Sequence, residues 1–139
     1  MTQENKHKLI EFFSKKDRLA KNNGMEILDV DEGYAKVSMK VKEEHLNGAD
    51  VCHGGIIFSL ADFAFAIASN SYGTLALGIN NSISYMNSAL EGETLFAKAQ
   101  EIDKNFKLGS YTITVTNEDN KTIAVMQGMV YKKDKKIIG

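Results

Sequence analysis

The chain has 139 residues, of which 43% are hydrophobic and 25% charged, with a net charge of -1 and a sequence pI near 6.3. This length suits one domain over residues 1–139, and the balanced charge argues against the basic face of a nucleic-acid-binding protein. No uncharged apolar run approaches the roughly 18 residues of a membrane span, and the polar start is unlike a signal peptide, so we expect a cytoplasmic protein without membrane or nucleic-acid partners.

The N-terminal part of the chain predicts a helix followed by two strands. Residues 4–20 carry apolar side chains among charged ones at helical spacing, and Asn22-Asn23-Gly24 ends that pattern. Residues 25–30 predict a short strand, residues 31–33 a turn, and residues 34–41 a second strand in which apolar and polar side chains alternate.

The segment Asn47-Gly-Ala-Asp-Val-Cys-His53-Gly54-Gly55 leads into an apolar run of helical length. At a helix start the first backbone N–H groups lack intrahelical acceptors, and the helix dipole favours negative charge there. His53 is expected to support this loop and not to act as a general base, because one ring nitrogen can hold the loop. The segment therefore predicts an oxyanion-binding site at Gly54 and Gly55.

One stripe of this helix carries no bulky apolar side chain. At about 100° per residue the stripe contains Gly55, Ser59, Asp62, Ala66, Ser69, Asn70 and Gly73. Asp62 has no Lys or Arg three or four residues away, and desolvation disfavours an unpaired carboxylate, so its pKa is expected to rise. Asp62 is therefore the candidate nucleophile or general base.

Gly54 and Asp62 are too far apart on one helix to act on the same carbonyl. Eight positions correspond to about 12 Å of helix, whereas reacting groups must lie about 3 Å from their target. Two antiparallel helices related by a twofold axis would bring Gly54 of one copy near Asp62 of the other. The spacing therefore predicts a homodimer as the smallest active unit.

The remainder of the chain predicts strands at residues 75–86, 94–102, 110–116 and 122–131, with turns at 91–93 and 117–120. On the first of these strands, Ile79, Ile83 and Tyr85 are expected to share one side. Antiparallel strands and one nearly all-apolar helix predict an α+β fold in which the sheet curls over the helix.

From Asn47 through Gly73, and more loosely to the C-terminus, the chain resembles the PaaI-like group of hotdog-fold acyl-CoA thioesterases. The hallmark of that group is Asn, a short gap, His-Gly-Gly and then Asp within the central helix. The resemblance implies a hotdog fold, a curled antiparallel sheet around a long central helix with an extra N-terminal helix, and dimers that pair into tetramers.

The resemblance also implies roles for single residues. The Gly54 amide would bind the thioester carbonyl, Asp62 would act from the partner subunit, Asn47 would orient water or substrate, and His53 would support the loop. The chain departs from some relatives at Gly78, where they carry a helpful Ser or Thr, and at Asn87-Ser88, where they often carry Pro.

The reaction implied is hydrolysis of an acyl-CoA thioester without a cofactor, since coenzyme A is part of the substrate. We expect an acyl slot between subunits lined by Phe58, Phe63 and Tyr85, with Asn81 among the substrate-binding residues. Lys104 and Lys107 are candidates for the CoA phosphates, because an ammonium group can pair with phosphate at a solvated site.

No metal is expected, because His7, His45 and His53 lack zinc-ligand spacing, and the lone Cys52 excludes an internal disulfide. Two alternatives use the same scaffold: an acyl-CoA dehydratase or hydratase, which normally pairs a His with an acid, and a non-catalytic acyl-CoA-binding module. A purely structural protein would be expected to carry a large residue on the Asp62 stripe. The sequence leaves open the preferred acyl chain, the choice between nucleophile and general base for Asp62, and the tetramer arrangement.

Overall fold

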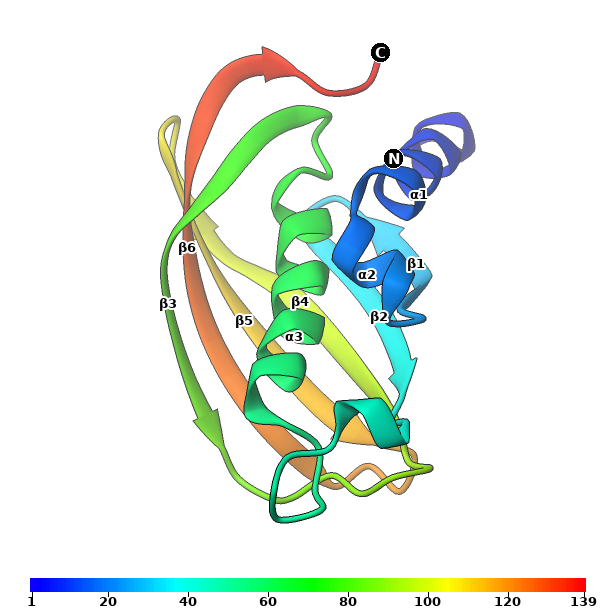
Figure 1. Ribbon diagram of the computed structural model, residues 1–139. Helices are drawn as coiled ribbons and strands as arrows, with labels where there is room; N and C mark the ends of the chain where they lie inside the picture. The colour runs from blue at the N-terminus through cyan, green and yellow to red at the C-terminus, as the bar shows by residue number, and fades with distance from the viewer.

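The central helix α3 (Gly54–Ser69) lies against the concave face of a curled six-stranded sheet in the computed structural model, which describes residues 1–139 (Figure 1). All strand pairs are antiparallel, in the order β1-β2-β4-β5-β6-β3. The strands are β1 (Glu26–Asp31), β2 (Tyr34–Lys40), β3 (Thr74–Tyr85), β4 (Thr94–Lys104), β5 (Leu108–Asn117) and β6 (Thr122–Lys136). The predicted α+β fold is confirmed.

Period-two alternation along the strands builds the core between sheet and helix. Tyr111, Ile113 and Val115 of β5 are buried, while the residues between them are partly exposed. The facing helix is apolar around most of its circumference and buries Leu60 and Ile67 completely, as expected for a helix enclosed by a curled sheet.

The prediction of one N-terminal helix over residues 4–20 is wrong, because the segment forms two helices, α1 (Gln3–Lys16) and α2 (Arg18–Asn22). Asp17 between them has an extended backbone, and its carboxylate accepts a hydrogen bond from the Ala20 amide at 3.1 Å. Aspartate is among the best N-cap residues, so Asp17 starts a new helix and redirects the chain. Both helices lie at the β1 side of the sheet, where α1 packs on β1 and α2 contacts α3 (Figure 1).

Strand β3 forms an edge of the sheet and is irregular. Its pairing with β6 shifts between Gly78 and Asn80, so one extra residue is inserted. The expectation that Ile79 shares one side of the strand with Ile83 and Tyr85 is therefore wrong: Ile79 is 55% exposed, whereas Ile83 packs against the core.

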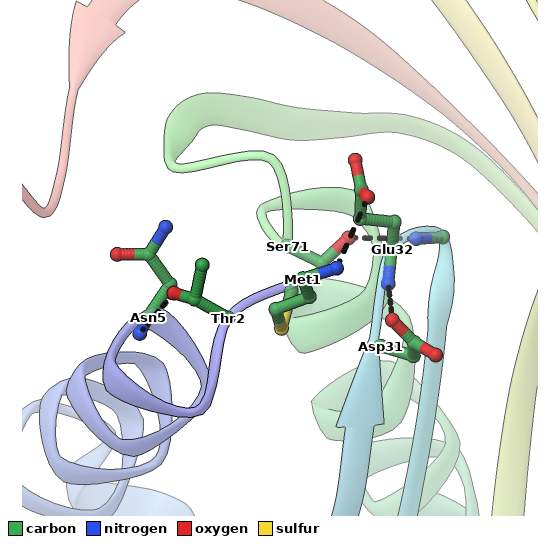
Figure 2. Close-up of polar contacts among 7 residues, drawn as sticks. Met1, Thr2, Asn5, Asp31, Glu32 and Ser71 are labelled. Carbon is green, nitrogen blue, oxygen red and sulfur yellow. Dashed lines mark hydrogen bonds and ion pairs between the residues drawn. The ribbon is translucent and has the colours of Figure 1, made fainter.

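The end of α3 is tied to the turn between β1 and β2. The Gly33 amide donates to the Ser71 hydroxyl at 2.7 Å, and the N-terminal ammonium lies 3.5 Å from Glu32 Oε1 (Figure 2). Before α3, a short 3-10 helix η1 (Glu43–His45), which the sequence pattern did not predict, leads into the loop that carries Asn47. None of the helices combines the length and apolarity needed to cross a bilayer.

Candidate active site

Helix α3 begins at Gly54, with His53 as its N-cap residue. The Gly55 amide donates to His53 Nδ1 at 2.9 Å, so a neutral His53 ring carries its proton on Nε2. The Gly54 amide, the first of the helix, has no acceptor within the chain. Of the two motif glycines, Gly54 therefore presents the free donor at the positive end of the helix dipole, and Gly55 does not.

The loop before α3 is held by its own polar groups. Asn47 Oδ1 accepts from the amides of Ala49 at 2.9 Å and Val51 at 3.3 Å, while the His53 amide donates to the His45 carbonyl at 2.8 Å. The Asn47 side-chain oxygen is thus used within the loop. Its amide nitrogen has no partner in the chain, which leaves N–H donors for a bound molecule.

Tyr85, from the far end of β3, covers the start of α3. Its hydroxyl donates to the Gly54 carbonyl at 2.9 Å, and a β-carbon at position 54 would lie 3.2 Å from Tyr85 Cζ. The close approach explains why this position suits glycine. A cavity of about 260 Å³ adjoins this point and is lined by Val51, Cys52, Gly54, Ile57, Tyr85, Met86, Asn87 and Ser88.

Asp62 lies two turns further along α3, about 12 Å from Gly54 at helical rise. It is half-buried at a cavity of about 190 Å³, which Phe58, Ser59 and Phe63 also line from α3. Asp17, Leu19, Ala20 and Met25 form the remaining walls. Burial raises the pKa of the Asp62 carboxyl, and the negative charge of Asp17 raises that pKa further. The predicted rise in the Asp62 pKa is confirmed, and one of its causes is Asp17, which is far from the motif in sequence.

The predicted site residues fall into two groups within one chain. Gly54, Asn47, His53 and Tyr85 lie at or near the helix start, whereas Phe58 and Phe63 share the cavity of Asp62. Phe58, Phe63 and Tyr85 therefore do not line one common cavity in a single chain: Phe58 and Phe63 line the cavity of Asp62, and Tyr85 lines the one at Gly54.

The remaining candidates lie elsewhere. Asn81 is exposed on β3, with its side chain over Gly128 and close to Gly78. The Lys104 ammonium lies 3.7 Å from the centroid of the Tyr72 ring, beyond the C-terminal end of α3, and Lys107 is next to Phe106 on the β4–β5 hairpin. In one chain, Lys104 is thus at the opposite end of α3 from Gly54.

Sequence reasoning missed His45, which is 4% exposed and uses both ring nitrogens. Nδ1 accepts from the Lys42 amide at 3.0 Å, and Nε2 lies 3.1 Å from Asn23 Oδ1. Nδ1 is thus an acceptor, so the proton is on Nε2 and is donated to Asn23. His45 therefore links the end of α2 to the loop before Gly54.

A larger cavity, of about 510 Å³, is at the other end of α3, beside the contacts drawn in Figure 2. It is lined by residues such as Met1, Glu32, Ser71 and Lys136 and contains none of the predicted site residues. The free Gly54 amide and the unpaired carboxylate of Asp62 lie outside this cavity. No three His, Cys, Asp or Glu side chains come together as metal ligands.

Known proteins resemble this chain over most of its length. Residues 49–124 match the family model of the thioesterase superfamily. A candidate esterase of Archaeoglobus fulgidus is 54% identical over 88% of this chain and 79% of its own length. The acyl-coenzyme A thioesterase PaaI of Escherichia coli is 40% identical over 84% of this chain and 83% of its own length.

Solved structures agree with this result. The structure of the E. coli PaaI protein from the phenylacetic acid degradation operon superposes with a TM-score of 0.94 at 34% identity, covering 98% of this chain and 99% of that one. A Streptococcus mutans protein solved with bound acetyl-CoA superposes with a TM-score of 0.78 at 26% identity, covering 81% of this chain and 90% of that one. The predicted hotdog fold and the resemblance to the PaaI-like group are confirmed.

Proposed function

This chain belongs to the thioesterase superfamily, and we propose that it hydrolyses acyl-CoA thioesters with a carboxylate from one protomer and a backbone amide from another. It is a thioester hydrolase of the PaaI-like group. In the proposed site, Gly54 N–H polarises the thioester carbonyl, and Asp62 of the partner copy attacks that carbonyl or activates a water molecule. The E. coli relative that acts on acyl-CoA and the S. mutans relative that binds acetyl-CoA support this substrate class.

One observation carries the proposal: the Gly54 amide has no acceptor in the chain although the neighbouring Gly55 amide is bound by His53. A free donor at a helix start favours negative charge as it develops on a carbonyl oxygen. One such donor is worth roughly 3 kcal/mol of transition-state stabilisation in other enzymes. Thioester carbonyls accept nucleophiles readily, so one donor and one carboxylate suffice without a triad.

The edge strand supports a shared site. Leu77 and Ile79 on β3 are 47% and 55% exposed, and an unpaired apolar edge favours association with another chain. Pairing of β3 with β3 of a second copy about a twofold axis would continue the sheet and bring the two α3 helices alongside each other in opposite directions. Each Gly54 would then approach the other copy's Asp62. Further pairing of dimers into tetramers belongs to the same proposal.

The raised pKa of Asp62 suits the proposed chemistry. A carboxylate that is partly desolvated and beside another negative charge binds a proton more readily, so it is a better general base towards water. As a nucleophile it would form a mixed anhydride with release of the CoA thiolate, and water would then cleave the anhydride. In either course the Gly54 amide stabilises the oxyanion, and the reaction needs no cofactor.

The remaining candidates have supporting parts in this proposal. The free side-chain nitrogen of Asn47 would orient water or substrate, and His53 would hold Gly55 so that Gly54 stays exposed. Phe58 and Phe63 would face the acyl group together with Tyr85 of the other copy, and Asn81 would contact the substrate from β3. Lys104 and Lys107 would meet the CoA phosphates.

The first experiment compares wild type with Asp62→Asn on a panel of aromatic and aliphatic acyl-CoA thioesters, with release of free CoA as the measurement. Wild type should release CoA, and Asp62→Asn should release at least about 100-fold less while still binding acyl-CoA. Equal release by both proteins would remove Asp62 from the mechanism. Binding without release by wild type would instead favour a binding module.

The second experiment tests the shared site by mixing two inactive variants. Asp62→Asn lacks the carboxylate, and Gly54→Pro lacks the amide proton. Hybrid dimers contain one site with both defects and one site with neither, so mixing should restore activity towards half of the wild-type level per hybrid dimer. If subunit exchange is verified by mass spectrometry and activity stays absent, the site is not shared.

A further inference from the structure

Asp17 is the one titratable residue that lines the cavity of Asp62 besides Asp62 itself. It interrupts the N-terminal helical segment, caps α2 through the Ala20 amide, and lines the same cavity of about 190 Å³ as Asp62. The two carboxyl groups are 45 positions apart in sequence. The break at residue 17 thus places an acidic side chain at the cavity of the candidate base.

The walls of this cavity contain no positive charge. Asp17 and Asp62 are its titratable residues, and the other walls are Leu19, Ala20, Met25, Phe58, Ser59 and Phe63. Asp17 takes part in no ion pair, and the same is true of Asp62. Two acidic side chains therefore line one small cavity that holds no counterion.

The cations of α2 form no ion pair with either carboxylate: Arg18 and Lys21 are exposed, and Arg18 donates to the Lys16 carbonyl. Strands β2, β4 and β5 place apolar residues such as Met39, Ala97 and Ile113 in the core beneath the helix. Tyr111 of β5 is titratable, but its ring packs on Phe65, about one turn of α3 beyond Asp62, and its hydroxyl donates to Glu101 of β4. Strand β1 is preceded by Met25, which lines the cavity and carries no charge.

We propose that Asp17 is a positioning residue for the hydrolytic reaction, which closes the cavity beside Asp62 and, by its negative charge, favours proton capture by that carboxylate. The inference rests on the proposed function, because it assigns Asp17 a purpose only if Asp62 is the base. Asp17 touches neither the thioester nor the reacting water. It acts through Asp62 alone.

Two roles of Asp17 must be separated, since a cap can be needed for folding alone. Asparagine caps helices about as well as aspartate, so Asp17→Asn keeps the hydrogen bond to Ala20 and removes only the charge. Asp17→Ser also retains a capping oxygen and serves as a second neutral variant. Glu4→Gln is the matched control, because it removes one negative charge from an exposed α1 residue paired with Lys8, outside the cavity.

The decisive measurement is the titration of the Asp62 carboxyl carbon by NMR, whose signal is assigned because it is absent in Asp62→Asn. The pH profile of kcat is measured beside it. Both neutral Asp17 variants should lower the Asp62 midpoint and the acidic limb of the profile by about 0.3 pH unit or more, with unchanged folding by circular dichroism. Glu4→Gln should leave both in place.

An unchanged midpoint in folded Asp17→Asn and Asp17→Ser overturns the inference, even if the enzyme hydrolyses thioesters as proposed. If the Asp17 variants lower the Asp62 midpoint but the wild-type protein releases no CoA, the electrostatic role of Asp17 is supported and the proposed function is contradicted. The NMR titration does not depend on activity, so the two failures are distinguishable.

Discussion

The Tyr85 hydroxyl donates a hydrogen bond of 2.9 Å to the carbonyl of Gly54, the residue whose amide is free at the start of α3. The bond joins the last residue of an edge strand to the first residue of the central helix, across 31 positions of sequence. The ring also lies against the glycine itself. Tyr85 therefore holds the residue whose amide we assign to the oxyanion.

Removing this hydroxyl should loosen the helix start without unfolding it. Tyr85→Phe loses one hydrogen bond to a carbonyl that also accepts from the helix, so the free energy of unfolding should fall by at most about 1 kcal/mol. kcat should fall about fivefold, the kinetic equivalent of that energy, because Gly54 is less firmly positioned. Urea unfolding and steady-state kinetics measure the two effects. A large loss of stability with unchanged kcat would contradict this role.

Two substitutions at Gly54 separate the amide proton from the space around it. Gly54→Pro removes the N–H at a first helical position that proline tolerates, and kcat should fall about 10²- to 10³-fold. Gly54→Ala keeps the N–H and adds a β-carbon 3.2 Å from Tyr85 Cζ, which the ring can accommodate by a small shift. The alanine variant should therefore lose less than about tenfold. Equal losses in both variants would show that crowding matters and the proton does not.

Asp62 should destabilise the fold at neutral pH. Its folded-state pKa is raised above the ordinary value of 3.8, so the folded chain binds a proton more readily than the unfolded chain. Any stability from this group is present at low pH and is lost as pH rises through the folded pKa. Asp62→Asn should thus be more stable than wild type at pH 7.5, by thermal unfolding at equal protein concentration, with a smaller difference at pH 4. A difference that grows towards low pH would be inconsistent with the raised pKa.

The parts of this molecule that were predictable from sequence depend on local patterns. Alternation along residues 110–116 reports a half-buried strand directly, and the spacing between Gly54 and Asp62 follows from helix geometry alone. The rise in the Asp62 pKa was predictable because the helix offers that carboxylate no cation within reach.

The unpredicted features depend on contacts between distant segments. The helical periodicity of the sequence continues through Asp17, and only the packing of α2 beside α3 places its side chain at the cavity of Asp62. The register shift near Ile79 arises from the pairing of β3 with β6, and the alternation of residues within β3 does not predict it. Likewise, to predict the contact between Tyr85 and Gly54 one must know which strand occupies the sheet edge beside the helix start.

Cys52 should be unreactive in the native protein. It is 4% exposed, and burial raises the pKa of its thiol to about 11. At pH 8 only about one thiol in a thousand would be ionised, and the thiolate is the reactive form. A thiol reagent should titrate one equivalent per chain in denaturant and almost none in the native state over the assay time. Cys52→Ala should keep kcat within about twofold, and a larger loss would indicate a role for the thiol.

His45 should make the fold sensitive to mild acid. Burial lowers the pKa of its ring below the ordinary value of 6.5, and Nδ1 must stay unprotonated to accept from the Lys42 amide. The stability it contributes is therefore complete above pH 6.5 and is lost as pH falls through the lower folded pKa. Urea unfolding at a series of pH values from 7.5 to 5 should show a decline in wild type.

The comparison with His45→Asn isolates this ring from every other titrating group. Asparagine supplies an acceptor and a donor but does not titrate, so the variant should be less stable at pH 7.5 by about 1–3 kcal/mol, the cost of imperfectly satisfied buried partners. Its deficit should shrink as the pH is lowered, because only wild type then gains a buried charge. The loop from His45 to His53 leads to Gly54, so wild-type kcat should also become more pH-sensitive than that of the variant on the acid side. A deficit that stays constant from pH 7.5 to 5 would mean that His45 does not titrate in this range, and would remove it from the acid response.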